Sequence, residues 1–106
     1  LAHLLPALEA RKGTVLVVSS SALDDPPAEW PHYVAAKHAV EGLAETAARE
    51  HPAVTVWVAR PPKLLTELVN TPMGRQGAAD PGHYAAALVR ALVSGERDPA
   101  NGLRRA

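Results

Sequence analysis

Serine, tyrosine and lysine side chains in the first third of the chain are the residues best suited to chemistry. Tyr33 and Lys37 are four residues apart, so in a helix they lie on one face, one turn from each other. An ammonium group beside a phenol favours the phenolate, and such a phenol exchanges a proton with a carbonyl or alcohol oxygen near neutral pH. A serine hydroxyl can hydrogen-bond the same oxygen, and residues 19–21 are all serine. The combination predicts acid–base chemistry on an oxygen atom.

These side chains need a strand and a helix to bring them together. Residues 14–18 form a continuous β-branched and apolar run, typical of a central parallel strand that is buried on both faces. A helix is predicted from about residue 32 to residue 50, where a His-Pro pair ends it, and residues 54–59 form a second apolar strand. A strand–helix–strand unit joins parallel strands. Ligands of open α/β sheets bind outside the carboxyl ends of such strands, and the three serines directly follow the first one.

The flanking segments add two further helices. Residues 1–9 have the apolar spacing of the end of a helix, and Gly13 suits the exit from it. Asp80 is a good N-cap for a helix that starts near Pro81. The remaining predictions are the end of that helix at Gly95, a short helix over residues 64–70, a loop over residues 71–79 and loose order after Gly95.

The composition is that of one small globular domain. The chain has 106 residues, of which 47% are hydrophobic, and its formal net charge is zero, so no charge pattern favours a nucleic-acid or membrane partner. It contains no cysteine, which excludes disulfides and thiol chemistry, and its five histidines lack metal-ligand spacing, so we predict no metal site. No apolar run approaches the ~18 residues that span a bilayer, and we expect a cytoplasmic protein. The sequence begins mid-pattern without methionine, and we expect a piece of a longer polypeptide.

Residues 4–66 resemble the catalytic half of the short-chain dehydrogenase/reductase family. The family's Tyr-x-x-x-Lys motif is matched by Tyr33 and Lys37. Its catalytic serine lies thirteen residues before the tyrosine, at the end of the preceding strand, and this position is Ser20. The serines on either side of it are weaker candidates. The helix of the family continues as Ala-Val-x-Gly-Leu, which is matched by residues 39–43.

A second matching segment follows the second strand. The family carries Pro-Gly-x-x-x-Thr there, in contact with the nicotinamide end of its cofactor, and residues 61–66 read PPKLLT. Pro61 and Thr66 match this pattern, whereas Pro62 replaces the glycine. The resemblance leaves the choice between NAD and NADP open, because the family reads the ribose 2′ position with residues upstream. It implies an NAD(P) site formed by Tyr33, Lys37, Pro61, Leu64 and Thr66.

The resemblance implies an NAD(P)-dependent oxidoreductase that reduces a small-molecule carbonyl compound or oxidises an alcohol. Tyr33 would donate or accept the proton, Lys37 would favour the phenolate and bind the nicotinamide ribose, and Ser20 would orient the substrate oxygen. The implied fold is α/β, the C-terminal portion of a Rossmann-like doubly wound parallel sheet. In the family, the helix equivalent to residues 32–50 builds a dimer interface, so a homo-oligomer is expected.

Some features depart from the family pattern. The glycine-rich phosphate loop is absent, and residues 74–77 (GRQG) follow no strand and cannot replace it. The last strand of the family would follow Ala106. We therefore expect residues 1–106 to be a partial Rossmann-type domain that is inactive in isolation. The missing loop and Pro62 also leave open a non-catalytic module of the same fold, kept for assembly or dimerisation.

Two smaller questions concern the loop after the serines. Trp30 can line a substrate pocket or cover the core, and we favour the core for a lone tryptophan. Residues 23–25 (LDD) follow the serine, whereas the Leu-Asp-Asp fingerprint of polyketide ketoreductases precedes it. We interpret the pattern as that of the ordinary short-chain dehydrogenase/reductase family. A reductase domain from a larger assembly remains an alternative.

Overall fold

The apolar runs predicted as strands pair in parallel at the centre of the molecule. In the computed structural model, β1 (Thr14–Val18) lies beside β2 (Thr55–Ala59), with Thr14 opposite Thr55. A third strand, β3 (Leu103–Arg105), completes a sheet of order β1-β2-β3. The structure describes residues 3–63, 79–94 and 102–106.

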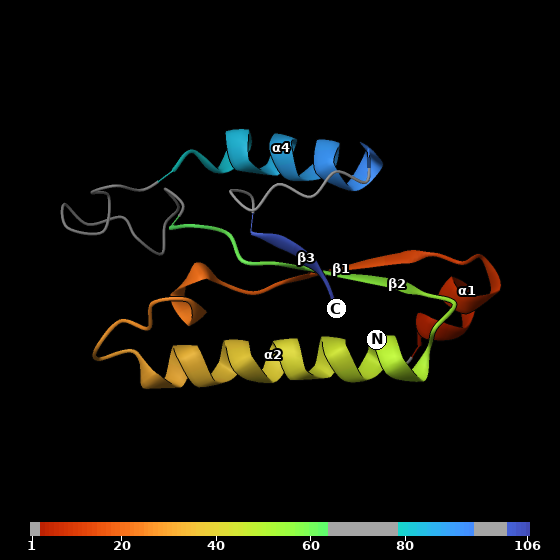
Figure 1. Cartoon of the computed structure of the whole chain (residues 1–106), viewed down its shortest axis with the longest axis horizontal. Coiled ribbons are helices and arrows are strands. Elements are labelled where there is room, and N and C mark those ends of the chain that lie inside the picture. Colours follow the sequence, from red (N-terminus) through yellow and green to blue (C-terminus); the bar gives the residue numbers. More distant parts are fainter. Residues whose placement is uncertain (1–2, 64–78, 95–101) are drawn as a thin grey trace.

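Helices cover both faces of this sheet and produce three layers (Figure 1). α1 (Leu5–Ala10) and α2 (Pro31–Glu50) lie on one face, whereas α4 (Pro81–Ser94) lies on the other. Successive strand side chains point to opposite faces, so the strands contribute to two separate cores. This layering is the α/β architecture of part of a Rossmann-like fold. The core beside α1 and α2 contains Ala44, Val54, Val56 and Val58, and the core beside α4 contains Ala59, Leu88, Ala91 and Leu103.

The chain passes from α1 into β1 through a Schellman turn. Pro6 lies in the first turn of α1, where its missing N–H leaves no bond unmade. The helix ends where predicted, but Lys12 rather than Gly13 takes the left-handed conformation, with φ of 51°. Lys12 N–H donates to Glu9 O (3.3 Å) and Gly13 N–H donates to Leu8 O (2.7 Å). Gly13 packs tightly on α1, because a Cβ there would lie 2.6 Å from Leu8 Cδ2 and would displace that side chain.

The longer helices keep close to their predicted limits. α2 has a proline in its first turn and ends where His51 N–H donates to Ala47 O (2.9 Å). Asp80 Oδ1 accepts a hydrogen bond from Gly82 N–H (3.0 Å) at the start of α4, so the predicted cap is present. A single 3₁₀ turn, η1 (Ser21–Leu23), lies between β1 and α2. Within the described ranges, no helix combines the length and the apolar character needed to cross a membrane.

Expectations for the sheet need two corrections. β1 is an edge strand in the described part of the chain, and its last residue is 51% exposed. The region expected to be loosely ordered contains β3, which runs antiparallel to β2, so the sheet is mixed rather than parallel. β3 forms because Leu103 is buried in the core beside α4 and because Arg60 N–H donates to Gly102 O (2.9 Å). The predictions for residues 64–70 and 71–78 lie outside the described residues.

Candidate active site

The three serines leave β1 alongside the segment that leaves β2. Ser19 N–H donates to Ala59 O (2.7 Å) and Ser21 N–H donates to Pro61 O (3.0 Å), so the two chain segments stay paired beyond the strands. Ser20 lies between these contacts and caps η1, where its Oγ accepts a hydrogen bond from the N–H two residues later (3.1 Å). That bond uses a lone pair of the oxygen, so the hydroxyl proton of Ser20 remains available to a ligand.

Ser19 is the least accessible of the three serines. It is only 2% exposed, and its hydroxyl lies close to the Glu41 carboxylate without reaching hydrogen-bond geometry. Ser21 is half-buried at the start of η1. Burial thus removes Ser19 as a direct ligand of a substrate, and Ser20 stays the candidate.

Tyr33 and Lys37 lie on α2, and Lys37 reaches the carboxyl end of β1. Lys37 Nζ lies 3.4 Å from Val18 O, a long hydrogen bond that ties the helix to the strand just before the serine turn. The same ammonium lies 5.7 Å from the centroid of the Tyr33 ring, within the range of cation–π attraction. Both side chains are half-buried. The structure therefore places Tyr33 and Lys37 at the end of the sheet where Ser20 lies.

Trp30 extends this group of side chains toward the solvent. Its ring meets the Tyr33 ring edge to face, with centroids 5.4 Å apart and planes at 77°. The His32 ring stacks on it at 6.4 Å and 21°. Trp30 is 41% exposed, so the interpretation of this residue as part of the core is wrong. Its nearest ring partner is the tyrosine of the candidate site.

A buried acid on α2, Glu41, binds two arginines and was missed by the sequence analysis. Arg60 contacts it through Nε and Nη2 (2.7 and 2.8 Å), and Arg104 Nη2 adds a third contact (2.8 Å). Arg60 Nη1 also donates to Asp24 Oδ1 after η1 (2.6 Å). The hydrogen bonds from Arg60, helped by the nearby charge of Arg104, lower the pKa of Glu41 to about 2 despite its burial. These contacts join the η1 loop, α2, the end of β2 and β3.

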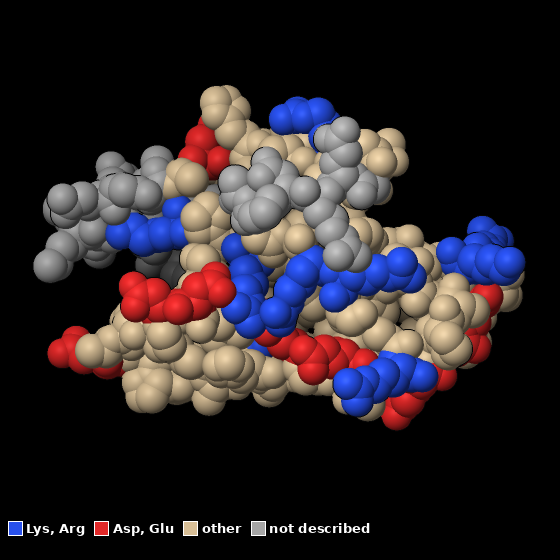
Figure 2. Space-filling model, viewed as in Figure 1, with Lys and Arg blue, Asp and Glu red and all other residues tan. Residues whose placement is uncertain are grey.

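The helix periodicity carried a signal for Glu41. It lies four residues after Lys37 and three before Ala44, on the stripe of α2 that faces the sheet. A charge in a buried stripe needs a partner of opposite charge. The partners are far away in sequence, because Arg60 lies 19 residues and Arg104 lies 63 residues from Glu41. In Figure 2, basic side chains cross the middle of the face directly above acidic side chains along α2.

The segment expected to meet a cofactor is described only at its start. Pro61 lies beside the three serines, because its carbonyl oxygen accepts a hydrogen bond from Ser21 N–H. Leu64 and Thr66 lie outside the described residues. The Lys37 ammonium has three donors and directs one at β1, so it fits the hydroxyl groups of a nicotinamide ribose. No glycine-rich turn follows a strand within residues 3–63, 79–94 and 102–106. The described residues therefore offer no phosphate cradle.

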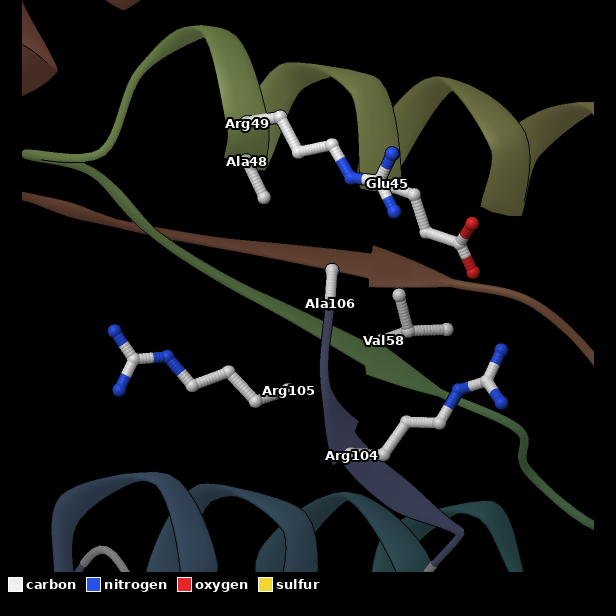
Figure 3. A pocket seen from close by; sticks show the side chains of 7 residues that line it. All are labelled: Glu45, Ala48, Arg49, Val58, Arg104, Arg105 and Ala106. Carbon is white, nitrogen blue, oxygen red and sulfur yellow. The ribbon is translucent and has the colours of Figure 1, made fainter.

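A cavity of about 480 Å³ lies elsewhere, between the C-terminal half of α2 and β3 (Figure 3). Val58 lies at its floor, and its lining includes Arg49, Arg104 and Arg105. Figure 3 shows that Arg104 and Arg105 extend to opposite sides of β3, as successive strand residues do, so their guanidinium groups do not converge. The first α2 residue that lines the cavity is Glu45, about two turns beyond Lys37, so the cavity is separate from the Tyr-Lys pair. The described residues contain no group of three or more side chains suited to a metal ion.

Comparison with known proteins adds an independent finding. A family model described as short chain dehydrogenase matches residues 1–76. The matched segment includes β1, the serine turn, α2, β2 and Pro61. The comparisons with curated proteins and with solved structures gave no significant match.

Proposed function

Because this chain belongs to the short-chain dehydrogenase family, we propose that it supplies the proton-transfer part of an NAD(P)-dependent oxidoreductase site. The substrate is a carbonyl compound that is reduced or an alcohol that is oxidised. One observation carries the proposal: Lys37 lies over the Tyr33 ring while it contacts the last residue of β1, just before Ser20. Proton donor, cation and serine thus lie at the sheet end where open α/β sheets bind ligands.

The described side chains support a simple division of roles. Ser20 Oγ, with its proton free, donates a hydrogen bond to the substrate carbonyl oxygen and holds it in place. The Tyr33 hydroxyl passes its proton to that oxygen as the carbonyl carbon becomes an alcohol carbon. The Lys37 ammonium stabilises the tyrosinate that remains. In the oxidation direction, each proton movement is reversed.

Members of this family generally bind NAD(P), which when bound would supply or accept the hydride. In our proposal Lys37 holds the nicotinamide ribose, and Pro61, Leu64 and Thr66 line the nicotinamide. Pro62 lacks an N–H, so it offers the cofactor no backbone donor. The described residues provide no phosphate cradle, and we expect the 106-residue chain to be inactive in isolation.

The test is the variant Tyr33→Phe in the complete gene product. Removing one general acid is expected to lower turnover by ~100-fold to ~10,000-fold while NADH or NADPH affinity changes little. Tyr84→Phe is the matched control, because the only other tyrosine among these 106 residues lies on α4, on the opposite side of the sheet. Near-normal turnover by Tyr33→Phe, or an equal loss in the control, would refute the assignment. Titration of both nucleotides also settles which of them the protein prefers.

A second candidate function is assembly through α2, and the outer face of this helix favours it. Leu43 is 61% exposed, and the space beside Gly42 is open to at least 4 Å, so another backbone can approach closely. A homodimer through this face is expected to dissociate in Gly42→Arg. Ala86→Arg adds the same charge on the exposed face of α4 and is expected to leave the dimer intact. Analytical sedimentation of the two variants measures their oligomeric states. A dimer that binds neither nucleotide would indicate a non-catalytic module.

A further inference from the structure

Trp30 is a large aromatic side chain that the fold does not use for its core. It is 41% exposed, and it belongs to neither of the two core clusters. Its ring contacts are with Tyr33 and His32, both in the first turn of α2. Within the described part of the chain its indole N–H donates to no acceptor. The indole is therefore partly exposed to solvent beside the tyrosine.

The preceding loop holds this side chain in place. Asp24 at the start of the loop binds Arg60 (2.6 Å), and two prolines follow at residues 26 and 27. Glu29, directly before Trp30, has φ of 72°, a conformation that non-glycine residues rarely adopt. At the other end, Val34 N–H donates to Trp30 O (3.1 Å) within α2. The backbone is thus held on both sides of Trp30, and the ring contacts with His32 and Tyr33 position the indole.

The position of the indole defines what can cover it. A substrate whose oxygen meets the Tyr33 hydroxyl lies near this indole, since the Trp30 and Tyr33 rings pack together with centroids 5.4 Å apart. Aromatic rings pack at centroid distances of ~4.5–7 Å, so a planar ring attached to the carbonyl can pack against the exposed part of the indole. The loop also carries exposed Asp25 and Glu29, which disfavour an anionic substrate, and Figure 2 shows acidic side chains over this region.

We infer that Trp30 forms an aromatic subsite that selects neutral aryl ketones, or the matching aryl alcohols, as substrates. The inference rests on the proposed oxidoreductase function and adds the substrate class to it. Offset or edge-to-face packing distinguishes an aryl group from a saturated ring of equal size, because only the aryl group has a quadrupole. Trp30 is therefore a specificity-determining residue, and proton transfer remains the role of Tyr33.

The experiment compares acetophenone with cyclohexyl methyl ketone, which differ in aromaticity and hardly in size. In the complete gene product, Trp30→Leu is expected to lower kcat/KM for acetophenone about tenfold and to change that for cyclohexyl methyl ketone by about twofold or less. Trp30→Phe keeps an aromatic ring and is expected to retain most of the preference. Trp57→Phe is the matched control, because the other tryptophan packs in the core beside α4.

A binding measurement separates failure of this inference from failure of the proposed function. Saturation-transfer NMR of 1-phenylethanol detects contact with its phenyl protons without any turnover. Turnover of both ketones with equal losses in Trp30→Leu would overturn the subsite and leave the function standing. Absence of turnover together with phenyl contacts that disappear in Trp30→Leu would overturn the function and support the subsite. Absence of turnover without such contacts would overturn both.

Discussion

Replacing Glu41 with glutamine is expected to destabilise the fold more than any exposed substitution on the same helix. The Glu41 carboxylate receives three hydrogen bonds from the Arg60 and Arg104 guanidinium groups, at 2.7 to 2.8 Å. Only 6% of the side chain is exposed, so little water screens these contacts. Glutamine keeps the size of the side chain but removes its charge, and it leaves Arg60 without its buried counter-ion.

The magnitude follows from the pKa of the carboxyl group. Hydrogen bonds from Arg60 are the main reason that the pKa of Glu41 falls from the ordinary 4.5 to about 2 in the folded chain. A pKa difference of about 2.5 corresponds to about 3 kcal/mol, since a difference of one is worth about 1.4 kcal/mol. Because the folded value is the lower one, this stabilisation is fully present above pH 4.5 and is lost as the pH falls toward 2.

The assay is urea unfolding followed by tryptophan fluorescence, at neutral pH and at several values between 4.5 and 2. Glu41→Gln should lower the free energy of unfolding by about 3 kcal/mol at neutral pH and should flatten its acid dependence. Glu45→Gln is the matched control, because Glu45 is exposed one turn later and makes no ion pair within the described residues. A loss below about 0.5 kcal/mol, or an unchanged acid dependence, would refute the reasoning.

Three further predictions concern Gly102, Gly42 and Tyr84. Gly102→Ala should lower the free energy of unfolding by about 1–3 kcal/mol, because Gly102 has φ of 63° and a Cβ would lie 2.4 Å from Arg60 O. Gly42→Ala should raise the free energy of unfolding by about 0.5–1 kcal/mol, since this helical glycine has open space beside it. Thermal unfolding measures both variants, and a change of the same sign in the two would contradict the geometry. In Tyr33→Phe the one remaining tyrosine, Tyr84, should titrate above pH 10 by ultraviolet absorbance, because burial raises its pKa. Its folded pKa exceeds the ordinary 10.0, so Tyr84 should also make the fold less stable as the pH rises past 10, and a folded-state midpoint at or below 10 would argue against burial.

The strands and long helices could be predicted because their signals are local. A β-branched run between Gly13 and the serines predicts β1, and the His-Pro pair after Glu50 predicts the end of α2. β3 has no such signal, since two of its three residues are arginine. It forms because Leu103 reaches the core beside α4 and Gly102 permits a close approach to Arg60. Such a strand depends on tertiary contacts rather than on its own sequence.

The candidate site shows the same division between local and distant information. The spacing of Tyr33 and Lys37 needs only helix geometry, and it predicts their shared face. The environment of Glu41 depends on arginines from β3 and from the end of β2, which no local pattern connects to α2. Hydrophobicity alone predicts burial of Trp30, whereas the side chain lies at the surface next to a proline-containing loop.

The Glu41 carboxylate also has a consequence for how the chain opens. β3 spans only three residues, and Arg104 within it is held by an acid on a helix rather than by the neighbouring strand alone. Through Arg60, the same carboxylate is linked to Asp24 in the η1 loop. Local unfolding usually proceeds in cooperative units of contiguous structure. Here a side-chain cluster joins segments up to 80 residues apart in sequence, from Asp24 to Arg104, so amide hydrogens of β3 and of the η1 loop should exchange with solvent as one unit.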